Sequence, residues 1–245
     1  MFQTRDKQGR RGKAPFRVAM TAFAMAFLAS WPLKAMAEPP AAAPVATPLT
    51  IVAFGDSLTA GYLLPPDAGF PEQLQAALKA RGHENVTVRN AGVSGDTTSG
   101  GLSRLDWAVG AETDAVILEL GANDALRSID PAIARKNLDE IITRLKERNL
   151  PILLAGMYAP PNLGKDYAAR FNPIYPGLAE KHDLTLYPFF LDGVVTHPKL
   201  MLSDGLHPTA EGVAEIVTRI MPDVEKLIAR TRREARESAA PADAP

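Results

Sequence analysis

Four short segments of the sequence carry residues that together can transfer an acyl group through a serine. The segments are Gly55-Asp56-Ser57-Leu58, Ser94-Gly95-Asp96, Gly121-Ala122-Asn123-Asp124 and Asp204-Gly205-Leu206-His207. A serine hydroxyl is a poor nucleophile until a base accepts its proton, and His207 can be that base for Ser57. The second ring nitrogen of such a histidine needs an acceptor, which Asp204 supplies three residues earlier.

The same chemistry needs hydrogen-bond donors for the negative charge that develops on the carbonyl oxygen of the substrate. We expect this oxyanion hole to consist of the backbone N–H groups of Ser57 and Gly95 and the side-chain amide of Asn123. The reaction requires no metal ion or cofactor, and we expect none. Taken singly, each segment has a plainer interpretation, because Gly-Asp-Ser, Asn-Asp and Asp-Gly-Leu-His also occur in turns and before helices.

Apolar runs that alternate with helical patterns must position these segments. The expected strands are 51–54, 86–90, 114–121, 151–157 and 184–190, and the expected helices are 70–81, a segment around 102–107, 131–149, 166–182 and a last helix from 209. This alternation predicts an α/β fold, a three-layer α/β/α sandwich around a five-stranded parallel sheet. The carboxyl ends of parallel strands lie at one edge of the sheet, so we expect the four segments to meet there.

Three residues within these elements carry separate expectations. Glu119 interrupts the most apolar strand, and we favour a structural partner over a group that supports the site. Pro188 cannot donate a ladder hydrogen bond, which places the strand 184–190 at a sheet edge. Pro222 is expected to kink or restart the last helix.

The loop after the strand 151–157 is a candidate wall for an acyl or aryl pocket. Met157, Tyr158, Pro160 and Leu163 are the residues that we expect to line it. The same proline-rich loop is equally well explained as a rigid connection.

The N-terminus has the three parts of a secretory signal peptide. Basic residues between Arg5 and Arg17 precede the apolar run 18–31, and Ala35-Met36-Ala37 fits a cleavage site before Glu38. An uncleaved anchor and twin-arginine export through Arg10-Arg11 are the alternatives. We therefore expect a signal peptide at 1–37, a Pro/Ala-rich linker at 38–48, a hydrolase domain at 49–230 and a flexible tail at 231–245.

The charge and the composition of the chain limit its possible binding partners and kinds of site. Residues 1–37 hold seven of the 27 basic side chains and one of the 28 acidic ones, so the remainder carries a formal net charge of −7. An acidic body argues against nucleic acid and against a stable membrane anchor after signal cleavage. The sequence has no cysteine, which excludes disulfides and a thiolate nucleophile. His83, His182 and His197 have no paired ligands nearby in sequence and do not predict a zinc site.

The four segments, in this order, resemble the ordered blocks of the SGNH or GDSL hydrolases. The resemblance spans most of residues 49–228 and is closest to the branch of bacterial periplasmic arylesterases and acyl-CoA thioesterases/lysophospholipases. It implies a flavodoxin-like sheet, Ser57 as nucleophile, Asp204 and His207 as its triad partners, and Gly95 with Asn123 in the oxyanion hole. Thr59 replaces the second glycine of a G-x-S-x-G elbow, which disfavours an ordinary α/β-hydrolase.

The sequence thus predicts an exported, periplasmic or secreted, serine esterase. Its expected substrates are small-molecule carboxylic esters or thioesters with aryl or small-to-medium acyl groups, cleaved through an acyl-Ser57 intermediate. Two alternatives remain at this point. One is a carbohydrate O-deacetylase, although only Trp107 remains as a tryptophan after the expected signal peptide. The other is a catalytically silent ligand-binding domain on the same fold.

Overall fold

Five parallel strands form the centre of the computed structural model, which describes residues 47–239. The strands are β1 (Leu49–Gly55), β2 (Val86–Gly92), β3 (Ala115–Glu119), β4 (Ile152–Ala155) and β5 (Thr185–Tyr187), in the sheet order β2-β1-β3-β4-β5. The predicted α/β fold and its parallel sheet are confirmed. The chain leaves β1 toward β2 on one side and returns to β3 on the other, so the strand order reverses between β1 and β3.

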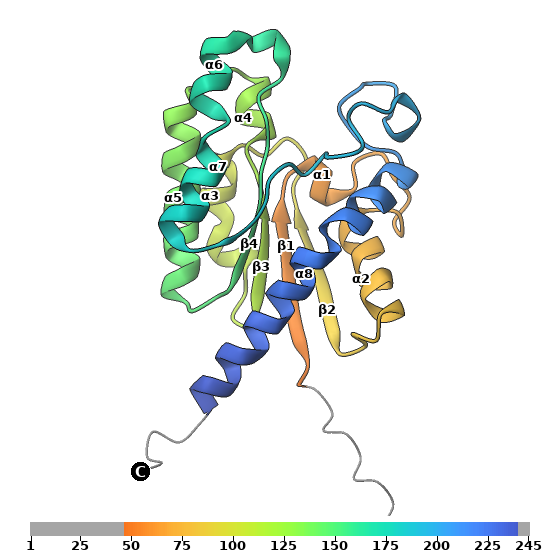
Figure 1. Ribbon diagram of the computed structural model, residues 1–245, viewed down its shortest axis with the longest axis vertical. Helices are drawn as coiled ribbons and strands as arrows, with labels where there is room; N and C mark the ends of the chain where they lie inside the picture. Colours follow the sequence, from red (N-terminus) through yellow and green to blue (C-terminus); the bar gives the residue numbers. More distant parts are fainter. Residues whose placement is uncertain (1–46, 240–245) are drawn as a thin grey trace, which may run out of the picture. The chain divides into compact units, whose positions relative to one another are not determined.

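Helices cover both faces of the sheet (Figure 1). One layer holds α2 (Phe70–Ala80) and α8 (Ala210–Ala239). The other holds α3 (Thr98–Ala108), α5 (Pro131–Glu147), α6 (Gly164–Phe171) and α7 (Ile174–His182). Short helices α1 (Ser57–Ala60) and α4 (Ala122–Leu126) follow β1 and β3 directly, and the 3-10 turns η1 (Pro161–Leu163) and η2 (Pro198–Leu200) lie in loops.

The central strands are apolar because both faces of the sheet are covered. Every residue of β3 and β4 is buried, as a parallel sheet between two helical layers requires. The helix α5 presents the stripe that its sequence predicts, with Leu138, Ile141, Ile142 and Leu145 fully buried. Asp130 caps this helix by accepting a hydrogen bond from the Ala132 N–H at 3.1 Å.

Proline explains one departure from the expected elements. The predicted helix 166–182 is wrong, because the chain forms two helices, α6 and α7, separated at Asn172 and Pro173. Pro173 has no N–H to continue the hydrogen-bond ladder. The side chain of Asn172 instead accepts a hydrogen bond from Ala159 N–H at 2.9 Å and ties the break to the loop after β4.

The strand β5 is shorter than predicted and lies at the sheet edge as expected. It ends at Tyr187, immediately before Pro188. The helix α3 begins earlier than expected, at Thr98, because the Thr97 hydroxyl caps it by accepting from Gly100 N–H at 3.2 Å. Two glycines therefore lie inside a helix that sequence propensity alone would start later.

The C-terminal boundary at residue 230 is also wrong. The helix α8 continues through Ala239 and passes over Pro222 without restarting. Thr231 is buried, and Arg232 donates to the side chain of Asn85 at 3.0 Å, so this part of the chain packs against the domain. The expected signal peptide, all but the last two residues of the expected linker, and residues 240–245 lie outside the described residues.

The described residues belong to one unit, Val45–Pro245. Among residues 47–239, no helix combines the length and the hydrophobicity that crossing a bilayer requires.

We predict that the late part of α8 contributes to stability. Ile228→Ala removes a side chain that is 1% exposed and should lower the free energy of unfolding by about 3 kcal/mol. Urea denaturation measures this change. Arg236→Ala, on the exposed side of the same helix, is the control and should alter stability by less than about 0.5 kcal/mol. Equal stability of the Ile228→Ala variant and the parent protein would show that this helix end does not pack as described.

Candidate active site

The serine segment lies where β1 ends, beside the point at which the strand order reverses. Asp56 caps α1 by accepting the Leu58 N–H at 3.0 Å, which places Ser57 at the first position of that helix. Gly55 leaves room for this turn, because a Cβ there would lie 2.0 Å from the Thr59 hydroxyl and 2.6 Å from the Glu119 carboxylate. The crevice outside a reversal of strand order is the usual ligand site of an open α/β sheet.

The loop before α8 brings a histidine and an aspartate to this serine. His207 Nε2 lies 2.9 Å from Ser57 Oγ, and His207 Nδ1 lies 2.7 Å from Asp204 Oδ2. The other carboxylate oxygen of Asp204 accepts the N–H groups of Leu206 and His207 at 2.9 and 3.0 Å. The arrangement can deprotonate Ser57, and Asp204 can hold the imidazole with its Nδ1 protonated.

Asp204 remains ionised because of its hydrogen bonds. The backbone N–H of Leu206, followed by the bond to the His207 ring, lowers the pKa of Asp204 to about 2. A carboxylate that stays charged at neutral pH can stabilise the imidazolium that forms when His207 takes the serine proton.

The two remaining predicted residues lie on the loop that follows β2 and on the short helix that follows β3. Gly95 has φ +85°, a left-handed conformation that favours glycine, and its carbonyl accepts from Arg127 at 2.7 Å. Asn123 lies in the first turn of α4 and donates its Nδ2–H to Asp56 Oδ2 at 3.1 Å. Each amide NH₂ has a second hydrogen, so Asn123 can still donate to a substrate oxygen.

Buried hydrogen bonds join the Asn123 helix to the helix after the Gly95 loop. Asp124 accepts from the N–H and the hydroxyl of Thr98 at 2.7 and 2.6 Å. Gly121 precedes α4 with φ +119°, and a Cβ there would lie 2.2 Å from the hydroxyl of Tyr175. The positions of the two loops are therefore coupled through α3, α4 and α7.

Arg104 is a residue that the sequence analysis did not identify. Its guanidinium, in a side chain 8% exposed, donates to the carbonyls of Gly55 and Ala91, both at 2.9 Å, and pairs with Asp96. It also lies 4.3 Å above the ring of Phe54. One buried cation thus joins the ends of β1 and β2 to the Gly95 loop. Its only sequence signal was an arginine on the apolar face of a helix.

Two buried carboxyl groups lie directly behind Ser57. Glu119 Oε2 accepts from the hydroxyl of Thr59 at 2.8 Å and from the Asp56 N–H at 3.3 Å. Burial, and then the charge of Asp56, raise the pKa of Glu119 well above its usual range. Burial likewise raises the pKa of Asp56 to about 6, although hydrogen bonds from Leu58 and Asn123 oppose this rise. Glu119 therefore lies beneath the nucleophile turn, closer to the site than the sequence indicated.

Two partly exposed side chains, Tyr62 and Leu206, lie beside His207. The ring of Tyr62, which is 42% exposed, lies 4.6 Å from the imidazole of His207, and Leu206 beside it is 45% exposed. The sequence analysis did not single out Tyr62.

The predicted pocket loop divides into buried and exposed residues. Tyr158 is 49% exposed and packs on Phe189 at 4.8 Å, while Pro160 and Leu163 are partly exposed. Met157 is 2% exposed and belongs to the hydrophobic core, so the expectation that it lines an open pocket is not supported.

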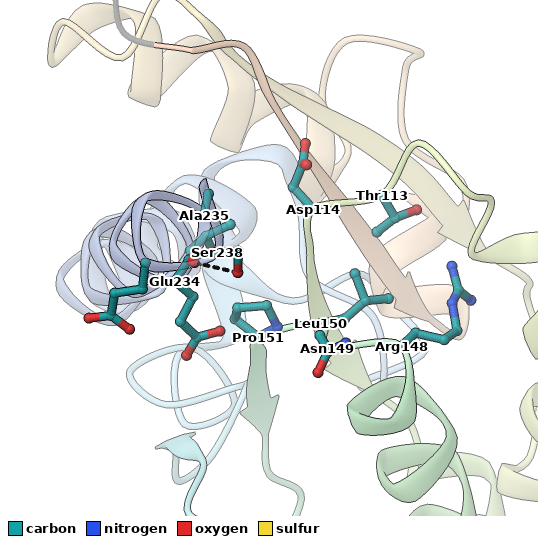
Figure 2. A pocket seen from close by; sticks show the side chains of 11 residues that line it. Thr113, Asp114, Arg148, Asn149, Leu150, Pro151, Glu234, Ala235 and Ser238 are labelled. Atoms are coloured by element: carbon teal, nitrogen blue, oxygen red, sulfur yellow. Dashed lines mark hydrogen bonds between the residues drawn. The ribbon is translucent and has the colours of Figure 1, made fainter. Parts of the chain in front are cut away.

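A cavity lies away from these residues. It has a volume of about 600 Å³ and lies near the amino ends of the strands. Figure 2 shows Glu234, Ala235 and Ser238 of α8 on one side of it and Asp114, Leu150 and Pro151 on the other. Neither Ser57 nor His207 lines this cavity. Within residues 47–239 no group of three or more His, Asp or Glu side chains could hold a metal ion.

Comparison with known proteins agrees with this geometry. Residues 53–214 match the model of the GDSL-like Lipase/Acylhydrolase family. The chain belongs to this family.

Similar proteins within the family are named as esterases. An arylesterase from Vibrio mimicus is 42% identical over 173 residues, which cover 69% of this chain and 86% of the relative. The thioesterase 1/protease 1/lysophospholipase L1 of Escherichia coli K12 is 34% identical over 180 residues, 73% of this chain and 85% of the relative. The crystal structure of AlinE4, an SGNH-hydrolase family esterase, matches with 48% identity and a TM-score of 0.62, covering 73% of this chain and 96% of AlinE4. The chain is thus a serine hydrolase of the SGNH type.

We predict that removal of Arg104, which holds the Gly95 loop, lowers the stability of the protein measurably. Arg104→Met leaves Asp96 charged and largely buried, so the free energy of unfolding should fall by about 3–5 kcal/mol. A second change, Asp96→Asn, should restore part of this loss. Urea denaturation provides the measurement. Arg144→Met, which breaks an exposed pair with Asp106, is the control and should cost less than about 1 kcal/mol. Similar losses of unfolding free energy for Arg104→Met and Arg144→Met would contradict the role of Arg104.

Proposed function

We propose that this chain hydrolyses carboxylic esters or thioesters with aryl or small-to-medium acyl groups through an acyl-Ser57 intermediate. The observation that carries the proposal is the continuous contact of Ser57 Oγ, the two ring nitrogens of His207 and Asp204 Oδ2. It supplies a nucleophile, a base and a group that orients the base. The named relatives, an arylesterase and a thioesterase/lysophospholipase, support the reaction class.

The reaction proceeds in two halves. Ser57 Oγ attacks the carbonyl carbon while His207 Nε2 accepts its proton, and the carbonyl oxygen becomes an oxyanion opposite the proposed donors of Ser57, Gly95 and Asn123. The tetrahedral intermediate collapses when His207 returns the proton to the leaving alcohol or thiol. Water then attacks the acyl-enzyme by the same proton transfers, which releases the acid and regenerates Ser57.

Apolar surroundings support aryl and acyl substrates over polar ones. Tyr62 and Leu206 flank His207, and Tyr158 is exposed on the loop after β4. We therefore keep Tyr158, Pro160 and Leu163 as the proposed substrate wall. The deacetylase alternative gains no support from Trp107, because α3 carries it toward the end of the sheet opposite Ser57. The intact serine, histidine and aspartate argue against a silent binding domain.

Ser57→Ala tests the proposal. The protein from Glu38 onward should react with a fluorophosphonate probe and cleave p-nitrophenyl acetate, butyrate and octanoate as well as an acyl-CoA thioester. Ser57→Ala should abolish labelling and reduce kcat at least about 10³-fold, because the nucleophile is lost. Ser103→Ala, an exposed serine of α3, is the matched control and should leave both readouts unchanged. Turnover that does not depend on Ser57 would overturn the proposal, and faster cleavage of an acetylated xylooligosaccharide would favour the deacetylase.

We also propose that the chain is exported. The basic residues, the apolar run and the small residues at 35 and 37 support this location. Mass spectrometry of the full-length protein expressed in a bacterium should find a mature N-terminus at Glu38 in the periplasm or the medium. An intact Met1 on protein that stays with the membrane fraction would indicate the uncleaved anchor instead.

A further inference from the structure

Asp56 is a carboxyl group at a position where burial makes a charge expensive. Its side chain is fully buried, as is that of Glu119 beside it, and neither makes an ion pair with a lysine or arginine within residues 47–239. A helix cap alone does not require this, because a serine or asparagine caps equally well. The second oxygen of Asp56 has a different partner, Asn123.

We propose that Asp56 is a positioning residue for the oxyanion hole, because its carboxylate fixes which atom of the Asn123 amide faces the substrate. The inference rests on the proposed function and extends it. Asp56 Oδ1 is engaged by Leu58 N–H at 3.0 Å, and Oδ2 accepts Asn123 Nδ2–H at 3.1 Å. An ionised carboxylate only accepts hydrogen bonds, so the amide must turn its NH₂ group toward Asp56. The remaining hydrogen of that NH₂ group then points toward the reaction centre.

The neighbouring groups determine which of the two carboxyls holds the charge. The ionisable groups that act on Asp56 are Glu119 of β3, His207 of the loop before α8 and Tyr175 of α7. Two buried carboxyls in contact do not both ionise readily. Each carboxyl accepts two hydrogen bonds, but those of Asp56 engage both of its oxygens, whereas both bonds to Glu119 reach Oε2 and its Oε1 has no partner in the described part of the chain. Burial also raises the pKa of Glu119 well above its usual range and that of Asp56 only to about 6. Glu119 is therefore the neutral member, and Asp56 is the acceptor for Asn123.

Asp56→Asn separates this role from capping and packing. The new amide keeps the volume and can still accept Leu58 N–H through its oxygen, so its NH₂ then faces the NH₂ of Asn123. Two NH₂ groups cannot bond to each other, so the Asn123 amide must rotate. Its carbonyl oxygen then takes the position that its NH₂ group holds in the parent protein and accepts from the new NH₂ group at position 56. That oxygen repels the oxyanion. We expect kcat to fall about 10²-fold with KM within about threefold, as for the loss of one oxyanion donor.

A double-mutant cycle shows whether the effect passes through Asn123. Asn123→Ala alone should also lower kcat about 10²-fold, and Asp56→Asn should add less than about threefold to it, because the group it misdirects is already absent. Asp114→Asn is the control. It makes the same change in a carboxylate that accepts one N–H, from Thr50, at the other end of β1, and should leave kcat unchanged. Multiplicative losses in the double variant, or a wild-type kcat for Asp56→Asn, would overturn the inference.

Two further measurements keep the test decisive. Should Asp56→Asn not fold, Asp56→Ser keeps a cap, lacks the second oxygen and should show the same loss and the same dependence on Asn123. The acidic side of the pH profile of kcat/KM gives an independent readout, because a proton on Asp56, whose pKa is about 6, removes the constraint on Asn123. The profile should fall less steeply in Asn123→Ala than in the parent protein; equal steepness would count against the inference.

Comparison of the parent protein with Ser57→Ala distinguishes a failure of the positioning role from a failure of the proposed function. Ser57-dependent turnover with an Asp56→Asn variant as active as the parent protein refutes only the positioning role. Loss of Ser57 dependence refutes the proposed function itself.

Discussion

The pairing of β1 with β3 is the interaction on which the rest of the site depends. Gly55, the last residue of β1, lies opposite Glu119, the last residue of β3, in a parallel register. This register places Ser57 and Asn123, 66 positions apart in the sequence, on adjacent turns at one sheet edge. A shift by one residue would also reverse the faces of the sheet that the buried side chains of β3 occupy. The apolar pattern that forms the core therefore also aligns the reactive groups.

Buried polar groups form hydrogen bonds around the ends of β1, β2 and β3. Asp56 and Glu119 lie between β1 and β3, where the Thr59 hydroxyl donates to Glu119. On the other side of β1, Arg104 joins its end to β2 and pairs with Asp96. Such groups stabilise a fold less than apolar packing would, and each missing partner is expensive. What these polar groups contribute is orientation, because a hydrogen bond depends on direction and can fix the angle of a loop, whereas an apolar contact does not depend on direction. The site is thus built on rigid backbone turns that are held by charged side chains.

Local patterns in the sequence predict the strands, most helices and the segments that carry Ser57, Asp204 and His207, which lie in contact in the structure. Apolar runs report burial on both faces of a sheet, and the four turn segments report chemistry through residue type. Contacts between distant segments leave no such pattern. Arg104 reads as an ordinary helical arginine until Gly55 and Ala91 are brought to it, and Tyr62 acquires meaning only beside His207. Pro173 lies inside the predicted helix 166–182 and separates it into α6 and α7. The charged sequence after Thr231 resembled a loose end because its few anchoring contacts, such as that of Arg232 with Asn85, are tertiary.

Asp204 and His207 lie in one short loop, and this has a consequence for how the protein can lose activity. The loop is closed by the bond from Leu202 N–H to the His207 carbonyl at 2.7 Å and by the bridge between Met201 and Pro208. The aspartate binds both the backbone and the ring of the histidine, so these bonds hold the two residues together independently of Ser57. Displacement of the loop removes the base and its partner together and leaves Ser57 as an ordinary alcohol. A change that displaced this loop would therefore separate Ser57 from a His207–Asp204 pair that is still intact.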